Sequence, residues 1–306
     1  MSLNVNERFL QSCKKNNEED VLDCLENGAD VNCKSCDEDG TTFTGLSIAA
    51  SRNYPELVDL LLARGADVNK TTLYKYYQDD EDIEEVTPLM IASKQEHHQI
   101  VKRLLQVHNI DILFEDSLGW TALHLCAGSK ECLEEFAKIP LVDLDWNCVN
   151  GMGETPLFSA ANLNSDCVKF ILSQPSVNPN IQDENSDTPI LFCLKEMDRD
   201  NLEEFKSHLD NLDCPMPMPM VRDFDSKTFK TFKILLDCPK IEIDSSLAWA
   251  REQAAEPESS SWASRWRNEI VKQLSRALES RAVDVKKRNV GSDNTPEANR
   301  RKKEDS

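Results

Sequence analysis

The chain has 306 residues, enough for two ordinary domains or for one long repeat array. Its formal net charge of -20 and pI near 4.7 argue against a general binder of nucleic acid or of anionic membranes. No run approaches the ~18 apolar residues of a membrane helix, and the N-terminus lacks the pattern of a signal peptide. The eleven scattered cysteines, several at positions where a helix core takes small apolar residues, indicate a reducing, intracellular location, cytoplasmic or nuclear.

The clearest structural unit is residues 44–69, which predict a helix, a polar turn, a second helix and the exit Gly-Ala-Asp-Val-Asn. Residues 6–32 fit the same pattern more loosely and end in the same five residues. Two helices this short cannot bury their apolar faces alone, so copies are expected to stack. The polar first helix of residues 6–32 is typical of an end repeat, because one of its faces meets water.

Later copies of the unit begin at regularly spaced threonines. The starts are Thr44, Thr87, Thr121, Thr155 and Thr188, separated by 43, 34, 34 and 33 residues, with Ser245 as a degenerate start 57 residues further on. The threonine hydroxyl can cap the first helix, and a proline at the first helical position has no amide hydrogen to leave unpaired. Second helices are predicted at 57–62, 100–105, 167–172 and 232–236.

Together these motifs resemble the ankyrin repeat, with its TPLHxAA start, IVxxLL second helix and GADVN exit. The resemblance covers roughly residues 6–280. It implies an all-α ankyrin-repeat solenoid of about seven stacked helix-turn-helix units with projecting loops and degenerate end caps. Glu96 and Lys130 stand at turn positions where the family prefers glycine. His97 and His124 stand where the family uses histidine structurally.

The repeat pattern also predicts the domain boundaries. The segments are 1–37 (N-terminal capping repeat), 38–70 (repeat 2), 71–112 (repeat 3, with a loop insertion at 71–86), 113–147 (repeat 4), 148–180 (repeat 5), 181–243 (repeat 6, with an insertion at about 200–227), 244–280 (degenerate C-terminal repeat and capping helix) and 281–306 (disordered basic tail).

The first insertion, residues 71–86, combines tyrosines with a run of carboxylates. One interpretation is a solvated, mobile charge run. The other is an interaction finger, in which Tyr74, Tyr76 and Tyr77 supply contact area and the acidic run selects a basic partner segment.

The second insertion, within residues 195–231, predicts an extra helix at 201–212 followed by alternating proline and methionine. Alternating proline favours an extended crossover and excludes helix. Cys214, Met216, Met218 and Met220 could instead hold a soft Cu(I) ion. Cys33 and Cys36 form a lone CxxC, either two loop thiols or a metal or redox pair.

At the C-terminal end, apolar residues recur every four positions, at Trp262, Trp266, Ile270, Leu274 and Leu278. This stripe predicts an amphipathic helix, either capping the open end of the stack or binding a partner. Two basic clusters follow, at 286–288 and 300–303. Their spacing resembles a bipartite nuclear import signal, although basic clusters also occur in solvated tails.

The resemblance also implies which residues contact a partner, because ankyrin repeats bind through loop tips and exposed first-helix positions. Matched residue by residue, the loop positions before the helix starts are Phe43, Val86, Trp120, Glu154 and Asp187, and those two residues upstream include Leu118 and Met152. The first-helix positions include Arg52 and Lys94, and Tyr74, Tyr76 and Tyr77 join them from the insertion. Phe43 and Trp120 are the expected anchors, unless Trp120 packs down on its neighbouring loop.

No nucleophile elbow, phosphate loop, zinc-protease motif or dinucleotide fingerprint occurs in the sequence. The expected function is therefore that of a non-catalytic adaptor or scaffold for one or more proteins, with no cofactor, no resident metal, no general nucleic-acid binding and no membrane association. Two alternatives stay open: a nuclear regulatory protein imported through its basic tail, and a regulatory or metal-linked subunit of an enzyme complex.

Overall fold

The computed structural model describes residues 4–37, 40–75, 83–140, 144–196, 227–255, 268 and 270–281. The chain forms two compact units, Met1–Ser186 and Asp187–Ser306. Several predicted features lie outside the described residues: Tyr76, Tyr77, the 201–212 helix, the Met-Pro run, the two tryptophans at 262 and 266, and the basic clusters of the tail.

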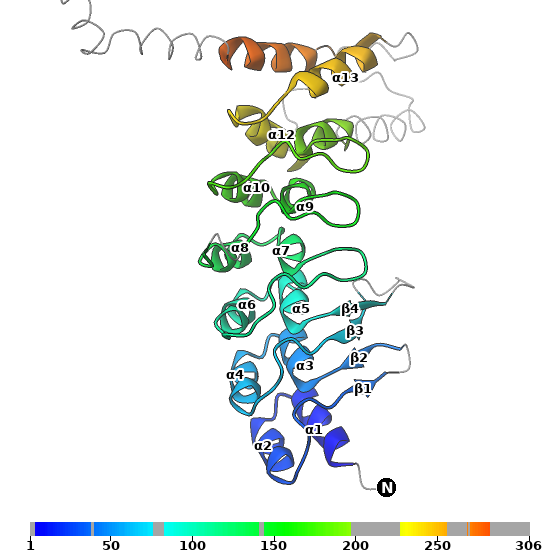
Figure 1. The fold of residues 1–306 in the computed structure, drawn as a ribbon, viewed down its shortest axis with the longest axis vertical. Helices are drawn as coiled ribbons and strands as arrows, with labels where there is room; N and C mark the ends of the chain where they lie inside the picture. Colours follow the sequence, from blue (N-terminus) through cyan, green and yellow to red (C-terminus); the bar gives the residue numbers. More distant parts are fainter. Residues whose placement is uncertain are drawn as a thin grey trace, which may run out of the picture. The chain divides into compact units, whose positions relative to one another are not determined.

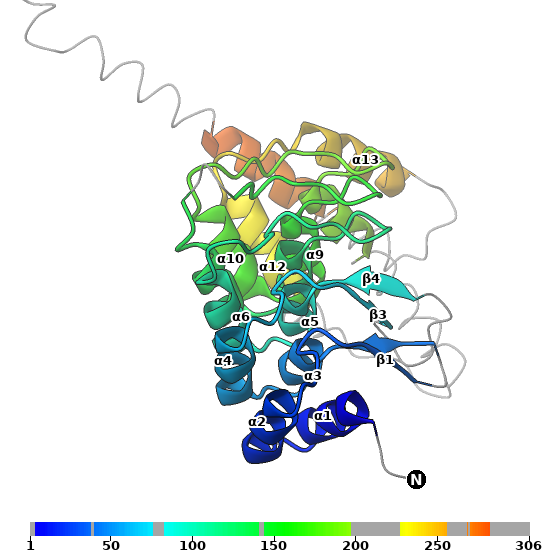
Figure 2. The ribbon, with the colours of Figure 1, turned by 60° about the horizontal axis from the view of Figure 1, so that its bottom comes forward.

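The first unit is a stack of helix pairs (Figures 1 and 2). The pairs are α1 (Val5–Lys14) with α2 (Glu18–Glu26), α3 (Gly45–Ser51) with α4 (Pro55–Ala63), α5 (Pro88–Lys94) with α6 (His98–Leu105), α7 (Ala122–Leu125) with α8 (Lys130–Phe136), and α9 (Pro156–Leu163) with α10 (Ser165–Leu172). The first helices pack in one layer from α1 to α9, and the second helices pack in another from α4 to α10. This mostly helical stack agrees with the predicted repeat solenoid.

Buried apolar residues lie between consecutive pairs as well as within them. Leu57 and Leu61 of α4 and Ile100 and Leu104 of α6 have no exposed surface. Each fully buried leucine contributes about 1.5–3 kcal/mol relative to an exposed one. Cysteines fill small places in the same core, and Cys126 is fully buried. Burial raises the pKa of its thiol well above the ordinary value, as expected of an unreactive core residue.

The threonine starts behave as helix caps at most positions. The hydroxyl of Thr44 accepts the N–H of Ser47 at 3.1 Å, and that of Thr87 accepts the N–H of Met90 at 3.3 Å. Thr155 differs, because its buried hydroxyl has no hydrogen-bond partner among the described residues. Pro156 nevertheless occupies the first turn of α9, where its missing N–H costs nothing.

The turns between paired helices need a left-handed residue. Asn53 and Glu96 supply it with φ of 57° and 58°, so Glu96 takes the conformation that favours glycine. The expectation for Lys130 was wrong: it is the first residue of α8 rather than a turn residue. His97 contacts the preceding repeat, since its Nδ1 lies 2.8 Å from the carbonyl oxygen of Ala50.

Two hairpins precede α3 and α5. Strand β1 (Ser35–Cys36) pairs antiparallel with β2 (Thr42–Phe43), and β3 (Thr72–Tyr74) pairs antiparallel with β4 (Glu84–Val86). The hydroxyl of Thr42 accepts the N–H of Leu73 at 2.8 Å, which ties the two hairpins together. The projecting loops of the all-α prediction thus contain short strands.

Asparagines link the exit loops of successive repeats. Asn32 Oδ1 accepts the N–H of Asp67 at 2.8 Å, and Asn69 Oδ1 accepts the N–H of Asp111 at 2.8 Å. Asn69 also donates to the carbonyl of Asn109 at 2.7 Å. The equivalent residue of the next exit is Leu113, which is 54% exposed and cannot make such bonds. The series resumes at Asn147, which binds Asn178 and Ser176.

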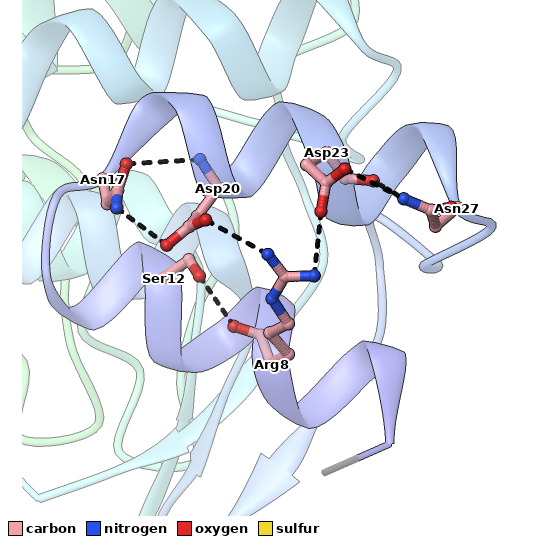
Figure 3. A network of polar contacts seen from close by, with 6 residues as sticks. All are labelled: Arg8, Ser12, Asn17, Asp20, Asp23 and Asn27. Carbon is pink, nitrogen blue, oxygen red and sulfur yellow. Dashed lines mark hydrogen bonds and ion pairs between the residues drawn. The ribbon is translucent and has the colours of Figure 1, made fainter. Parts of the chain in front are cut away.

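The end repeat carries a polar network on its helices (Figure 3). Arg8 of α1 pairs with Asp20 at 3.1 Å and Asp23 at 2.8 Å, both on α2. Asn17 caps α2 by accepting the N–H of Asp20. All three members of the ion pairs are about half exposed, so the network suits a repeat face in contact with water and adds little stability.

His124 occupies a buried position at the start of α7. Its Nδ1 accepts the N–H of Thr121 at 3.3 Å, which leaves the proton on Nε2, 3.1 Å from the carbonyl oxygen of Glu154 in the next repeat. The histidine therefore joins two repeats in its neutral form, as the structural interpretation expected. Burial lowers the pKa of His124 to about 4.

The second unit contains the helix at 189–196, α12 (Lys227–Asp237), α13 (Asp244–Ala255) and the helix at 270–281. Ile270 and Leu274 of the predicted stripe are buried. The guanidinium of Arg281 donates to the carbonyls of Leu236 at 2.7 Å, Cys238 at 2.8 Å and Ile241. Arg281, in the last described helix, therefore binds the carbonyls at the C-terminal end of α12.

We expect Asn69→Leu to lower the free energy of unfolding by about 1–2 kcal/mol, because two inter-repeat hydrogen bonds are lost. The reciprocal variant Leu113→Asn restores the amide at the equivalent position and should not destabilise the chain. Urea unfolding of both variants measures these changes. Equal stability of Asn69→Leu and the wild type would contradict the structural role of this amide.

The stability difference between wild type and His124→Gln should depend on pH. The unfolded chain protonates His124 near pH 6.5 but the folded chain only near pH 4, so the histidine's contribution is full above pH 6.5 and is lost as the pH falls toward 4. The difference should shrink by up to about 3 kcal/mol over this interval. Urea unfolding from pH 7 to pH 4 measures it, with His108→Gln as an exposed control. A constant difference would disprove the neutral buried state.

Candidate functional site

Three consecutive loops of the first unit share one internal geometry. Asp116 Oδ1 accepts the N–H groups of Leu118 at 3.0 Å and Trp120 at 2.8 Å. Asn150 Oδ1 does the same for Met152 and Glu154, both at 2.9 Å. In the third loop, Asp183 Oδ1 accepts the N–H of Asn185 at 2.8 Å. These side chains hold each loop in a defined shape before any partner is bound.

Backbone hydrogen bonds also join each loop to the next. The N–H of Gly151 donates to the carbonyl of Leu118 at 2.8 Å, and the N–H of Glu184 donates to the carbonyl of Met152 at 2.9 Å. Gly119 has a φ of 76°, and a Cβ there would lie 2.6 Å from the nitrogen of Gly151. Glycine is therefore required where the two loops approach most closely. The loops preceding α7 and α9 project on the same side of the stack as the hairpins (Figure 1).

This geometry leaves apolar side chains exposed at equivalent places. Leu118 is 51% exposed and Met152 is 49% exposed. Trp120 is half-buried, with its ring edge-on to His124 at 5.7 Å between centroids. This contact lies within the repeat of Trp120 itself, on the helix that follows its loop, and the predicted alternative, packing on the neighbouring loop, stays a prediction. We call Leu118, Trp120 and Met152 the loop-tip surface.

The same three loops also carry carboxylates. Glu115 and Glu184 are exposed, and Glu154 is half-buried, with its carboxylate accepting from Asn150 Nδ2 at 2.9 Å. Residues 113–120, 149–154 and 181–186 contain no lysine or arginine. The formal charge of these loops is therefore negative, and the exposed apolar side chains share the loops with carboxylates.

Two of the predicted contact residues are buried, so their side chains are not available to a partner. Val86 of β4 has no exposed surface, because the strand points it toward the core. Asp187, in the second unit, is 6% exposed and pairs with Lys195 at 2.6 Å. Sequence reasoning treated every loop position alike, although only some of them face outward.

The remaining predicted contact residues lie near the hairpins and the ends of the first helices. The ammonium of Lys14 lies over the half-buried ring of Phe43, 5.1 Å from its centroid. Arg52 is exposed and donates to the carbonyl of Lys14 at 3.1 Å, while Lys94 is half-buried. Tyr74 accepts a hydrogen bond from Gln95 at 2.9 Å. Phe43 therefore contacts a cation of its own chain, and Arg52 remains exposed.

The lone CxxC combines a half-buried thiol, Cys33, with an exposed one, Cys36. Burial, with the nearby charge of Asp30, raises the pKa of the Cys33 thiol to about 11, which disfavours the thiolate that binds metals. Cys36 is exposed, and both thiols are free. No group of three or more His, Cys, Asp or Glu side chains among the described residues is placed to hold a metal ion. Cys214 and the Met-Pro run lie outside these residues.

Comparison with known proteins gives relatives that share the repeat. The chain is 29% identical over 181 residues to the fowlpox virus (strain NVSL) protein FPV031, named as an ankyrin repeat protein, covering 55% of this chain and 48% of that protein. It is 38% identical over 112 residues to human ankyrin repeat and SOCS box protein 6, covering 36% of this chain and 23% of that protein. It is 28% identical over 193 residues to mouse rabankyrin-5, covering 59% of this chain and 16% of that protein.

The chain thus spans about half or less of the length of these relatives. None of the described helices is both long and apolar enough to cross a membrane. Residues 46–142 match the family model described as ankyrin repeats in three copies, and residues 152–184 match the model of the ankyrin repeat. Together with the helix pairs, projecting loops and linked exit loops of the first unit, these matches show that residues 46–142 and 152–184 of the chain are ankyrin repeats.

Proposed function

We propose that the chain is a non-catalytic adaptor or scaffold of about seven repeats that binds a partner protein through its loop tips and first-helix face. Ankyrin repeats are protein-interaction modules and are generally without catalysis. The observation that carries the proposal is the pair Leu118 and Met152, each about half exposed on hydrogen-bonded loops. Exposed apolar side chains on a preorganised surface gain from association without a large ordering cost.

Trp120 adds contact area beside this pair. Tryptophan is the residue type most often found to dominate interface energetics, and this ring is partly exposed while it contacts His124 edge-on. Tyr74, with Tyr76 and Tyr77 in the insertion, is proposed as a second contact region, and Arg52 and Lys94 as charged positions at the ends of the first helices.

Affinity capture with the 306-residue chain tests the proposal. The double variant Leu118→Ser/Met152→Ser should lose the proteins that the wild type retains, because both apolar anchors become polar. Leu163→Ser is the matched control, since Leu163 is also 51% exposed but lies at the end of α9. Equal capture by the wild type and the double variant would exclude the loop tips as the contact surface.

We also expect Trp120→Ala to weaken binding of a captured partner by about 2 kcal/mol. Thermal stability should fall only slightly, because the lost edge-on contact with His124 is worth about 1 kcal/mol. Calorimetric binding and thermal unfolding of the same preparation separate the two effects. A large fall in melting temperature with unchanged affinity would show that Trp120 serves the fold alone.

A further inference from the structure

The loop-tip surface has a charge and a spacing that together specify the chemistry of its partner. This inference rests on the proposed function and deepens it. Leu118 and Met152 occupy equivalent positions of adjacent loops, two residues after Asp116 and Asn150, and the Leu118 carbonyl accepts the N–H of Gly151 at 2.8 Å. Two apolar anchors therefore stand one repeat apart on a connected backbone.

The distance between these anchors follows from helix packing. The first helices α7 and α9 pack against each other, and packed helices lie about 8–10 Å apart. A partner helix rises about 10 Å over seven residues and returns to the same face. An extended strand places same-face residues about 6.6 Å or 13 Å apart, so these spacings match the ~8–10 Å between the anchors less well.

The charge of these loops determines the charge of the partner. Glu115 is an exposed carboxylate on the loop of Leu118, and Glu184 is one on the loop that follows the loop of Met152; the three loops carry no basic residue. Burial chiefly raises the pKa of the Cys148 thiol in the next repeat to about 11, and the charge of Glu115 adds a small part of this shift. Charge complementarity across an interface selects partners and speeds their encounter.

We propose that the loop-tip surface binds a basic amphipathic helix of a partner protein, with two apolar residues at positions i and i+7 that contact Leu118 and Met152. Lysines or arginines beside these residues then meet Glu115 and Glu184. The apolar pair supplies the buried contact, and the basic residues discriminate against neutral and acidic helices.

Fluorescence titration with synthetic helical peptides of about 18 residues tests the proposal. The first peptide carries leucines at i and i+7 flanked by lysines. The second has the same composition with leucines at i and i+5, which lie on different faces. The third replaces every lysine with glutamate. The first peptide should bind at least about tenfold more tightly than either of the others, and its affinity should fall as salt is raised.

Variants of the protein distinguish binding at the loop-tip surface from non-specific attraction of a basic peptide to an acidic chain. Glu115→Lys/Glu184→Lys should weaken the first peptide roughly tenfold or more and favour the third. Glu18→Lys/Glu19→Lys changes the net charge equally on α2, away from the loops, and should leave the preference unchanged. Leu118→Ser/Met152→Ser should weaken the first peptide by a similar factor, whereas Leu163→Ser should not.

Equal weakening by both charge reversals, or equal binding of the i, i+7 and i, i+5 peptides, would overturn the proposal and leave only non-specific attraction. If these peptides fail while protein capture still depends on Leu118 and Met152, the surface recognises another kind of partner and the proposed function stands. If neither peptide binding nor protein capture depended on Leu118 and Met152, the proposed function would be overturned as well. Binding of the first peptide that improves when residues 282–306 are deleted would show that the chain's own basic tail competes for the surface.

Discussion

The structure depends on the fact that a short helix pair cannot bury its own apolar side chains. Leu57 and Leu61 reach zero exposure because the next pair covers what their own pair leaves open. Stability therefore comes from contacts between neighbours along the stack. The end repeat meets water on one side and places there the partly exposed ion pairs of Arg8 instead of further apolar residues.

Outside the core, polar side chains likewise bond to the adjacent repeat. His124 bridges its own helix start and the carbonyl of Glu154 one repeat later. Asn32, Asn69 and Asn147 bridge the exit loops, and the series is interrupted where Leu113 replaces an asparagine. Backbone N–H groups of the exit loops thus find hydrogen-bond partners in the adjacent repeat. The loops thereby become as regular as the helices.

Regular loops make a surface from residues that are distant in sequence. Leu118 and Met152 are 34 positions apart, yet the backbone bond between their loops sets them at consecutive repeats. The same bonds leave their side chains outside, since the loop backbone is already paired. An apolar pair on loops that also carry carboxylates is then available on a preorganised scaffold, which lowers the ordering cost of association.

The sequence by itself determined the repeat register, the helix pairs and the structural histidines, because threonine caps, apolar spacing and the exit motif are local signals. It also marked Leu118, Trp120 and Met152 as loop positions. Only the tertiary structure decided which loop residues face outward: Val86 and Asp187 are buried, Leu118 is exposed, and Lys130 begins a helix. Exposure depends on how each loop bonds to the adjacent repeat, and that pairing joins residues more than thirty positions apart, beyond the reach of a local pattern.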